Sequence, residues 1–184
     1  FLSGCGAGLI ASLLWYKWQM GRYNCNHLLY SKTVIITGGT GGIGYETALD
    51  LAKRKTAHLI ITGRDVTKGM KAAKDIQETT GNTGVRFMKL ELSDMDDVKR
   101  FAEEIKTECK VIDILINNAG TVFKVRSLTP DGFESTMAAN YFGHFLLTDL
   151  LLPCIEKSKQ GRIVNLSSMV YKQDKLSIEN IDFS

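Results

Sequence analysis

The chain has 184 residues, of which 44% are hydrophobic and 23% are charged, as in a folded domain that buries its own core. Its net charge of +3 arises from Lys and Arg interleaved with acidic residues, so the basic stripe of a nucleic-acid-binding protein is missing. The cysteines form no CxxC pair and have no histidine at zinc-binding spacing, which argues against a structural metal site. They are Cys5, Cys25, Cys109 and Cys154.

The first residues differ in character from the rest of the chain. Residues 1–16 carry no charge, and the aromatic residues Trp15, Tyr16 and Trp18, typical of a membrane interface, close this apolar run before basic residues begin. We therefore predict a partial membrane anchor over residues 1–20, a linker over 21–32, and a domain over 33–184 that faces the cytosol. Two alternatives are a cleaved signal peptide, whose basic leading segment is not visible, and a buried helix of the domain.

From residue 33 onward, short apolar runs alternate with amphipathic stretches. The pattern predicts strands at 33–37, 58–62 and 85–90, the last of them more polar and nearer the edge of a sheet. Between them it predicts a helix at 42–54 and a second helix that starts at Val66 and is stopped by Gly81. These segments already form a β-α-β-α-β succession.

The second half of the chain continues the alternation. Ser93 is expected to cap a helix, with Asp96 three residues further on. A strand is expected at 111–116, a long helix from Pro130 to Glu156, and a fifth strand at 162–166. This succession predicts an α/β fold: a Rossmann-type, doubly wound parallel sheet of about five strands, incomplete at its end, with helices on both faces.

A glycine-rich turn joins the first expected strand to the first expected helix. In Thr37-Gly-Gly-Thr-Gly-Gly-Ile-Gly44, glycine lets a pyrophosphate approach the helix N-terminus, where free N–H groups favour negative charge. The run satisfies three glycine patterns: the general dinucleotide fingerprint, an epimerase-like pattern and that of the short-chain dehydrogenases. A tight structural turn without a ligand is a further alternative. Glycine alone therefore predicts nucleotide binding but does not choose the subfamily.

The run Asn117-Asn-Ala-Gly120, at the end of the fourth expected strand, chooses among these patterns. With the glycine turn it resembles the classical short-chain dehydrogenase/reductase family, and the resemblance continues in family order through Asn140 and the segment 162–168. Segments 63–65, 129–134 and 143–148 look most like the microsomal retinol dehydrogenase branch. That resemblance implies a membrane-anchored enzyme of the endoplasmic reticulum that acts on lipophilic alcohols and aldehydes.

The resemblance also implies a nicotinamide cofactor, and the end of the second strand indicates its form. Gly63 stands where an NAD enzyme carries an acid for the ribose 2′-hydroxyl, and Arg64 follows it, so a 2′-phosphate would meet a guanidinium. The neighbouring Asp65 would argue against a 2′-phosphate if it faced the ribose, but we expect it to be a solvated acid at the helix start. Glu91 replaces the family's usual Asp near the adenine. The resemblance implies NADP(H) bound by Thr37, Gly38, Thr40, Gly42, Ile43, Gly44, Arg64, Leu92, Asn118, Ala119 and Gly120.

The chemistry of the family uses an Asn-Ser-Tyr-Lys set, and the resemblance places two of its members here. Asn140 would help to hold a proton-relay water, and Ser168 would hydrogen-bond the substrate oxygen. One Tyr-x-x-x-Lys occurs, from Tyr171 to Lys175, but it begins three residues after Ser168 without a buried helical stripe, so we interpret it as loop. The catalytic tyrosine and lysine are therefore expected beyond the last residue, and the 184 residues alone are expected to be inactive. His144 is expected to pack or cap locally.

Together these inferences predict an NADP(H)-dependent oxidoreductase that interconverts a lipophilic alcohol and its aldehyde or ketone. The expected partners are a retinoid-like or other hydrophobic carbonyl compound and, through the N-terminal segment, a lipid bilayer. No nucleic acid and no metal is expected. One alternative of a different class stays open: a truncated, non-catalytic isoform that binds the cofactor or a partner protein.

Overall fold

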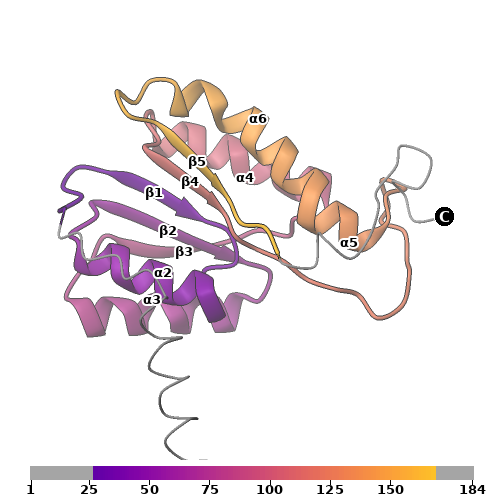
Figure 1. Cartoon of the computed structure of the whole chain (residues 1–184), viewed down its shortest axis with the longest axis horizontal. Helices are drawn as coiled ribbons and strands as arrows, with labels where there is room; N and C mark the ends of the chain where they lie inside the picture. Colours follow the sequence, from indigo (N-terminus) through magenta and orange to yellow (C-terminus); the bar gives the residue numbers. More distant parts are fainter. Residues whose placement is uncertain (1–26, 169–184) are drawn as a thin grey trace, which may run out of the picture.

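Apolar runs form five strands of one parallel sheet in the computed structural model, which describes residues 27–168 (Figure 1). The strands are β1 (Thr33–Ile36), β2 (His58–Gly63), β3 (Val85–Lys89), β4 (Ile114–Asn117) and β5 (Arg162–Asn165). Their order across the sheet is β3-β2-β1-β4-β5, and every neighbouring pair is parallel. The predicted α/β fold and the edge position of the third strand are confirmed.

Helices cover both faces of this sheet because successive strand side chains point to opposite faces. On one face, Val34 and Ile36 pack with α2 (Gly42–Lys53) and α3 (Val66–Thr80). On the other face, Ile35 packs with α4 (Met95–Glu108) and α6 (Gly143–Ile155). Figure 1 shows these two helical layers on either side of the sheet. The strand residues at the centre of both clusters are fully buried.

The helix ends follow local capping chemistry. Gly81 ends α3 in the left-handed conformation with φ of 67°, and its N–H donates to the carbonyl of Gln77, which confirms the predicted stop. The predicted cap of α4 was wrong by one residue. Asp94, not Ser93, is the N-cap, and its carboxylate accepts the N–H groups of Asp96 and Asp97. A carboxylate at this point also interacts favourably with the helix dipole.

The long helix predicted from Pro130 begins later than expected. Pro130 lies in a turn closed by a hydrogen bond from the N–H of Gly132 to the carbonyl of Thr129, 2.9 Å long. The helix starts with α5 (Ser135–Met137), whose N-cap Glu134 accepts the N–H groups of the second and third residues of that segment. The proline prediction failed because Pro130 is the second residue of this four-residue turn, a position that proline also favours, and Gly132 ends the turn with φ of 85°. A π-helical turn, η1 (Ala138–Phe142), then joins α5 to α6.

The fourth strand also begins later than the apolar run suggested. The prediction was 111–116, whereas β4 starts at Ile114. Val111 is exposed, and the N–H of Ile112 donates to the carbonyl of Cys154 at the end of α6 rather than to a strand. An apolar run therefore includes residues that pack against a helix before the ladder begins.

The topology determines where a ligand can bind. The chain moves outward through β2 and β3 on one side of β1, and through β4 and β5 on the other side. In open parallel sheets a ligand binds outside the carboxyl ends of the strands at this reversal point. Among residues 27–168, no helix has both the length and the apolar character needed to cross a membrane. The anchor predicted over residues 1–20 and the pair Tyr171 and Lys175 lie outside the described residues.

Candidate functional site

A cavity of about 460 Å³ opens at the carboxyl ends of β1, β2 and β4. The glycine turn, the loops after β2, β3 and β4, and the π-helical turn all contribute to its wall. Most of the residues proposed for cofactor binding line it: Gly38, Thr40, Ile43, Gly44, Arg64, Leu92, Asn118, Ala119 and Gly120. Thr37 and Gly42 lie in the same turn but not in the lining. The structure thus brings the sequence motifs together at the reversal point of the sheet.

Glycine is required in the turn where the backbone packs against itself. Gly38 has φ of +67°, and a Cβ on it would lie 2.8 Å from the Cα of Ala119. A Cβ on Gly44 would lie 2.4 Å from the carbonyl oxygen of Gly38, far inside van der Waals contact. These glycines let α2 begin directly beside the ends of β1 and β4. The first turn of α2 therefore lies in the cavity wall, where the helix dipole favours negative charge.

Thr37 fastens the glycine turn to the loop after β4. Its hydroxyl oxygen accepts the backbone N–H groups of Asn118 at 2.9 Å and Ala119 at 3.0 Å. The side-chain amide of Asn118 donates in return to the carbonyl of Thr37 at 2.8 Å. Thr37 is fully buried, so it acts by holding the two walls of the cavity together and does not line it.

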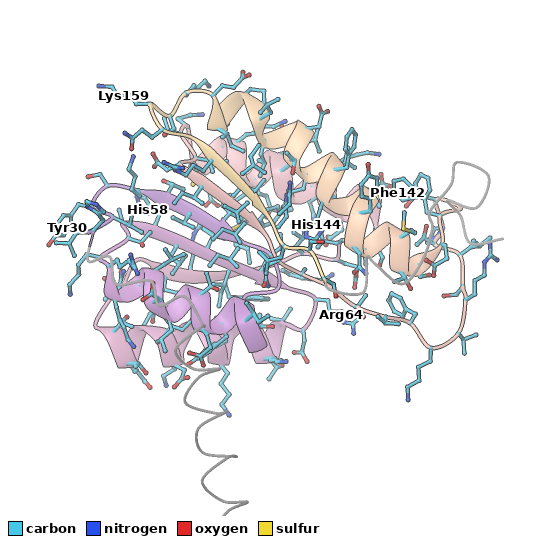
Figure 2. All side chains as sticks on the ribbon, viewed as in Figure 1. Tyr30, His58, Arg64, Phe142, His144 and Lys159 are labelled. Atoms are coloured by element: carbon cyan, nitrogen blue, oxygen red, sulfur yellow. The ribbon has the colours of Figure 1, made fainter. Side chains whose placement is uncertain are left out.

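Two cations stand at the end of the cavity beyond β2. Arg64 follows the last residue of that strand and is labelled in Figure 2, and Lys68 lies on the first turn of α3. The Lys68 ammonium lies 3.2 Å from the point where a Cβ on Gly41 would sit, so it reaches across to the glycine turn. Asp65 is the N-cap of α3 and accepts the N–H of Lys68 at 2.9 Å. Its carboxylate is thereby engaged at the helix start, which agrees with the expectation.

Glu91, where the family usually has Asp, is held by its own loop. Its carboxylate accepts the hydroxyl of Ser93 at 2.8 Å, and its N–H donates to the carboxylate of Asp97 at 2.7 Å. Burial raises the pKa of Asp97, but hydrogen bonds from Glu91 and Arg100 outweigh it and leave that pKa below its usual value. These bonds fix the loop that places buried Leu92 in the wall of the cavity.

Asn140 lies in the π-helical turn and lines both the first cavity and a second one of about 480 Å³. Its side-chain amide pairs with both backbone groups of Thr121: Oδ1 accepts the N–H, and Nδ2 donates to the carbonyl, each at 2.8 Å. The second cavity runs beside α6 past Tyr141, Phe145 and Leu166, and its wall is mainly apolar. Such a surface suits a hydrophobic molecule next to the first cavity.

Ser168 lies outside both cavities, although the resemblance placed it in the catalytic site. It is exposed, lies three residues after β5, and is absent from the lining of both cavities. The backbone before it is anchored, because the N–H of Leu166 donates to the carbonyl of Asn117 at 3.0 Å. Within residues 27–168, no group of three or more His, Cys, Asp or Glu side chains is arranged to hold a metal ion.

Three residues of this region were missed as site residues: Lys68, Thr121 and His144. Lys68 could have been found, because it stands in the first turn of the helix that follows β2, and a helix that starts after a parallel strand begins at the carboxyl end of the sheet. Thr121 gives no sequence signal, since it is bound through its backbone. The expectation that His144 packs or caps locally was incomplete, because its ring also reaches Thr37.

Known proteins similar to this chain are short chain dehydrogenases and retinol dehydrogenases. A family model described as short chain dehydrogenase matches residues 32–178. Retinol dehydrogenase 12 of Bos taurus is 46% identical over 153 residues, which cover 83% of this chain and 48% of that protein. Retinol dehydrogenase 11 of Homo sapiens is 44% identical, with the same two shares covered. The chain thus spans about half the length of the curated relatives it matches.

A solved structure shares the fold at lower identity. It is a short chain dehydrogenase from Escherichia coli CFT073, complexed with NADPH, with 30% sequence identity and a TM-score of 0.70. The match covers 82% of this chain and 64% of that one.

Proposed function

The chain belongs to the short chain dehydrogenase family, in the retinol dehydrogenase branch, and from that premise we propose that it is the cofactor-binding part of an NADP(H)-dependent oxidoreductase. Its substrates are a lipophilic alcohol and the corresponding aldehyde or ketone, of which a retinoid is one example. Membership of a family of oxidoreductases favours this reading over a non-catalytic isoform. The observation that carries the choice of cofactor is the pair Arg64 and Lys68 in the cavity wall.

The residues present fit a dinucleotide with a 2′-phosphate. The start of α2 supplies N–H groups for the pyrophosphate, and the close packing of Gly44 on Gly38 lets the phosphates approach them. Arg64 and Lys68 supply two positive charges beyond β2, while the nearby Asp65 carboxylate is engaged as a helix cap. When bound, the nicotinamide supplies or accepts the hydride.

At the other end of the cavity, residues of this chain orient the nicotinamide ribose and the substrate. Asn118 and Ala119, fixed through Thr37, form the wall for the nicotinamide ribose. Asn140 stands between the two cavities, where it helps to hold a proton-relay water, and Ser168 hydrogen-bonds the substrate oxygen in the intact protein. The apolar wall formed by Tyr141, Phe145 and Leu166 is proposed to receive the hydrophobic part of the substrate.

The test is a comparison of the two cofactors in the intact protein. NADPH and NADH are titrated by fluorescence, and their oxidation is followed with retinaldehyde and with a short polar aldehyde as control. We expect NADPH to be preferred by about tenfold or more, because a charge-assisted pair is worth about 1.5–3 kcal/mol. We also expect faster turnover of the apolar aldehyde. Equal use of the two cofactors would contradict the assignment of NADP(H).

We propose further that residues 1–20 hold the protein at the endoplasmic reticulum membrane, with the domain in the cytosol. The uncharged run 1–16, the aromatic residues after it and the following basic residues support this. Residues 1–20 fused to a soluble reporter should carry it into a carbonate-resistant membrane fraction, accessible to protease from the cytosolic side. A soluble reporter would argue against the anchor, and a protease-protected one against its orientation.

A further inference from the structure

The buried imidazole of His144 forms hydrogen bonds through both of its nitrogen atoms. His144 lies in the first turn of α6, between that helix and the sheet (Figure 2), and it is 7% exposed. Its Nε2 lies 2.8 Å from the hydroxyl oxygen of Thr37, and its Nδ1 lies 3.0 Å from the main-chain oxygen of Asn140. The ring therefore connects the glycine turn to the π-helical turn.

The hydrogen bonds of the Thr37 hydroxyl determine which nitrogen of the His144 ring carries the proton. The Thr37 hydroxyl oxygen already accepts two N–H groups, from Asn118 and Ala119, which occupy both of its lone pairs. It can only donate to His144, so Nε2 is the acceptor. The other possible acceptor, the carbonyl of Ile116, is 3.4 Å away and would form the weaker bond. The ring proton is then on Nδ1, where it donates to the carbonyl of Asn140.

The neutral form of the ring agrees with its surroundings. Burial lowers the pKa of His144, against a smaller opposing effect of the hydrogen bond to the Asn140 carbonyl. A proton on Nε2 would point at a hydroxyl oxygen that has no lone pair left. The neutral tautomer with its proton on Nδ1 therefore gives both ring nitrogens and the Thr37 hydroxyl a matching hydrogen-bond partner.

We propose that His144 is a positioning residue: its neutral Nδ1–H imidazole holds the Asn140 main chain and the Thr37 hydroxyl in one fixed arrangement. One arm reaches the wall of the cofactor cavity through Thr37 and the N–H groups of Asn118 and Ala119. The other arm holds Asn140 at the junction of the two cavities. The ring thereby sets the cofactor end of the site against the asparagine, an inference that rests on the proposed function for its catalytic consequence.

Two substitutions separate the two arms in the intact protein. In His144→Gln, the amide oxygen can accept the Thr37 proton, but the donor to Asn140 is lost. We expect kcat to fall about tenfold, with the Kd for NADPH within about twofold, because one hydrogen bond of about 1–1.5 kcal/mol is removed from the catalytic arm. In His144→Asn, the amide nitrogen can donate to Asn140, but the acceptor for Thr37 is lost. The Kd for NADPH should then rise about fivefold to tenfold, with the smaller change in kcat.

Controls distinguish positioning from general destabilisation. His58→Gln changes an exposed histidine at the start of β2, outside both cavities, and should alter neither constant. Melting temperatures of all variants show that each one is folded. Equal factors on kcat and Kd in both His144 variants would show a merely structural role and overturn the proposal.

A measurement on the unmodified protein decides the inference independently of catalysis. Nitrogen-15 NMR of the His144 ring at pH 7 should show a neutral imidazole protonated at Nδ1. An Nε2–H tautomer or an imidazolium would overturn the inference, whatever the enzyme assays give. If the NMR spectrum and the NADPH titrations behave as expected while no lipophilic aldehyde is reduced, the proposed substrate class fails and the role of His144 stands.

Discussion

The carboxylate of Asp65 caps the N-terminus of α3 by accepting the backbone N–H of Lys68 at 2.9 Å. The only acid in the segment 63–68 is thus held by the helix start, where the dipole favours its charge. The two cations on either side of it, Arg64 and Lys68, both line the cavity. This arrangement gives separate expectations for the three charged residues.

Arg64→Ala should remove most of the preference for NADPH. The loss of a charge-assisted hydrogen bond is expected to weaken NADPH binding by about tenfold to a hundredfold and to leave NADH binding within about twofold. Fluorescence titration of both cofactors measures this difference. The control is Lys71→Ala, an exposed lysine of α3 that does not line the cavity, which should leave both affinities unchanged. A parallel loss for the two cofactors would speak against contact with the 2′-phosphate.

Lys68→Met should show the same selectivity with a smaller effect. Lys68 is exposed, so its interaction with a phosphate is screened, and we expect about threefold to tenfold weaker NADPH binding. The salt dependence of NADPH affinity should also become shallower than in the unmodified protein. If NADH affinity fell equally, Lys68 would serve the pyrophosphate instead of the 2′-phosphate.

Asp65 is expected to matter for stability and not for the cofactor. Asp65→Ala removes the cap of α3 and should lower the free energy of unfolding by about 0.5–2 kcal/mol, whereas Asp65→Asn keeps a capping side chain and should cost less. Urea denaturation of both variants gives the comparison. Weaker NADH binding in Asp65→Asn would show that this acid contacts the ribose after all.

Gly44→Ala should damage both the fold and the cofactor site. Its Cβ would meet the carbonyl oxygen of Gly38 at 2.4 Å, and backbone cannot move aside cheaply, so we expect a loss of about 2–4 kcal/mol. Gly41→Ala is the matched control. Its nearest neighbour is the flexible end of Lys68 at 3.2 Å and its backbone is extended, so a change below about 1 kcal/mol is expected. Similar stability of the two variants would refute the close packing inferred for Gly44.

Asp113 should make stability depend on pH at the opposite end of the sheet. Its carboxylate accepts Lys32 Nζ, the N–H of Thr33 and the hydroxyl of Ser158. Burial raises its pKa, but these hydrogen bonds outweigh burial and leave the pKa below the ordinary value. A depressed pKa stabilises the fold above the unfolded-state value of about 3.9, and this contribution is lost as pH falls through the folded-state pKa.

Asp113→Asn should therefore flatten the acid limb of the stability profile. Urea denaturation between pH 6 and pH 2.5 would show a smaller loss of stability on acidification than in the unmodified protein. Identical acid limbs would mean that Asp113 is not a linked group.

The sequence predicted the elements whose physics is local. The strand predicted at 33–37 forms over 33–36, and the helix stop at Gly81 appears as expected, since they follow from β-branched residues and from a left-handed cap. The glycine turn was also predictable from the sequence, because a position with no room for a Cβ, such as Gly44, requires glycine. The run Asn117-Asn-Ala-Gly120, which begins at the last residue of β4, then indicated that Asn118 and Ala119 share a site with that turn, and both line the same cavity as the turn in the structure.

What the sequence did not predict depends on competition between distant groups. Pro130 carries a helix-start signal, but Glu134 caps two N–H groups and determines where the helix begins. Val111 belongs to an apolar run, yet the ladder begins at Ile114 because the segment between them contacts the end of α6. Thr37, the distant partner of His144, is 107 residues away in the sequence, and no periodicity predicts a hydrogen bond over that separation.

The paired hydrogen bonds between Asn140 and Thr121 also divide the segment after β4 into parts that open separately. Thr121 is clamped at both backbone groups, whereas Val122 and Val125 just beyond it are 83% and 76% exposed. Local opening should therefore start after the clamp, at low free energy, without disturbing the sheet. In hydrogen exchange the amide of Thr121 should be protected longer than those of the exposed Val122 and Val125. Such a boundary would let this segment move while the cofactor wall stays in place.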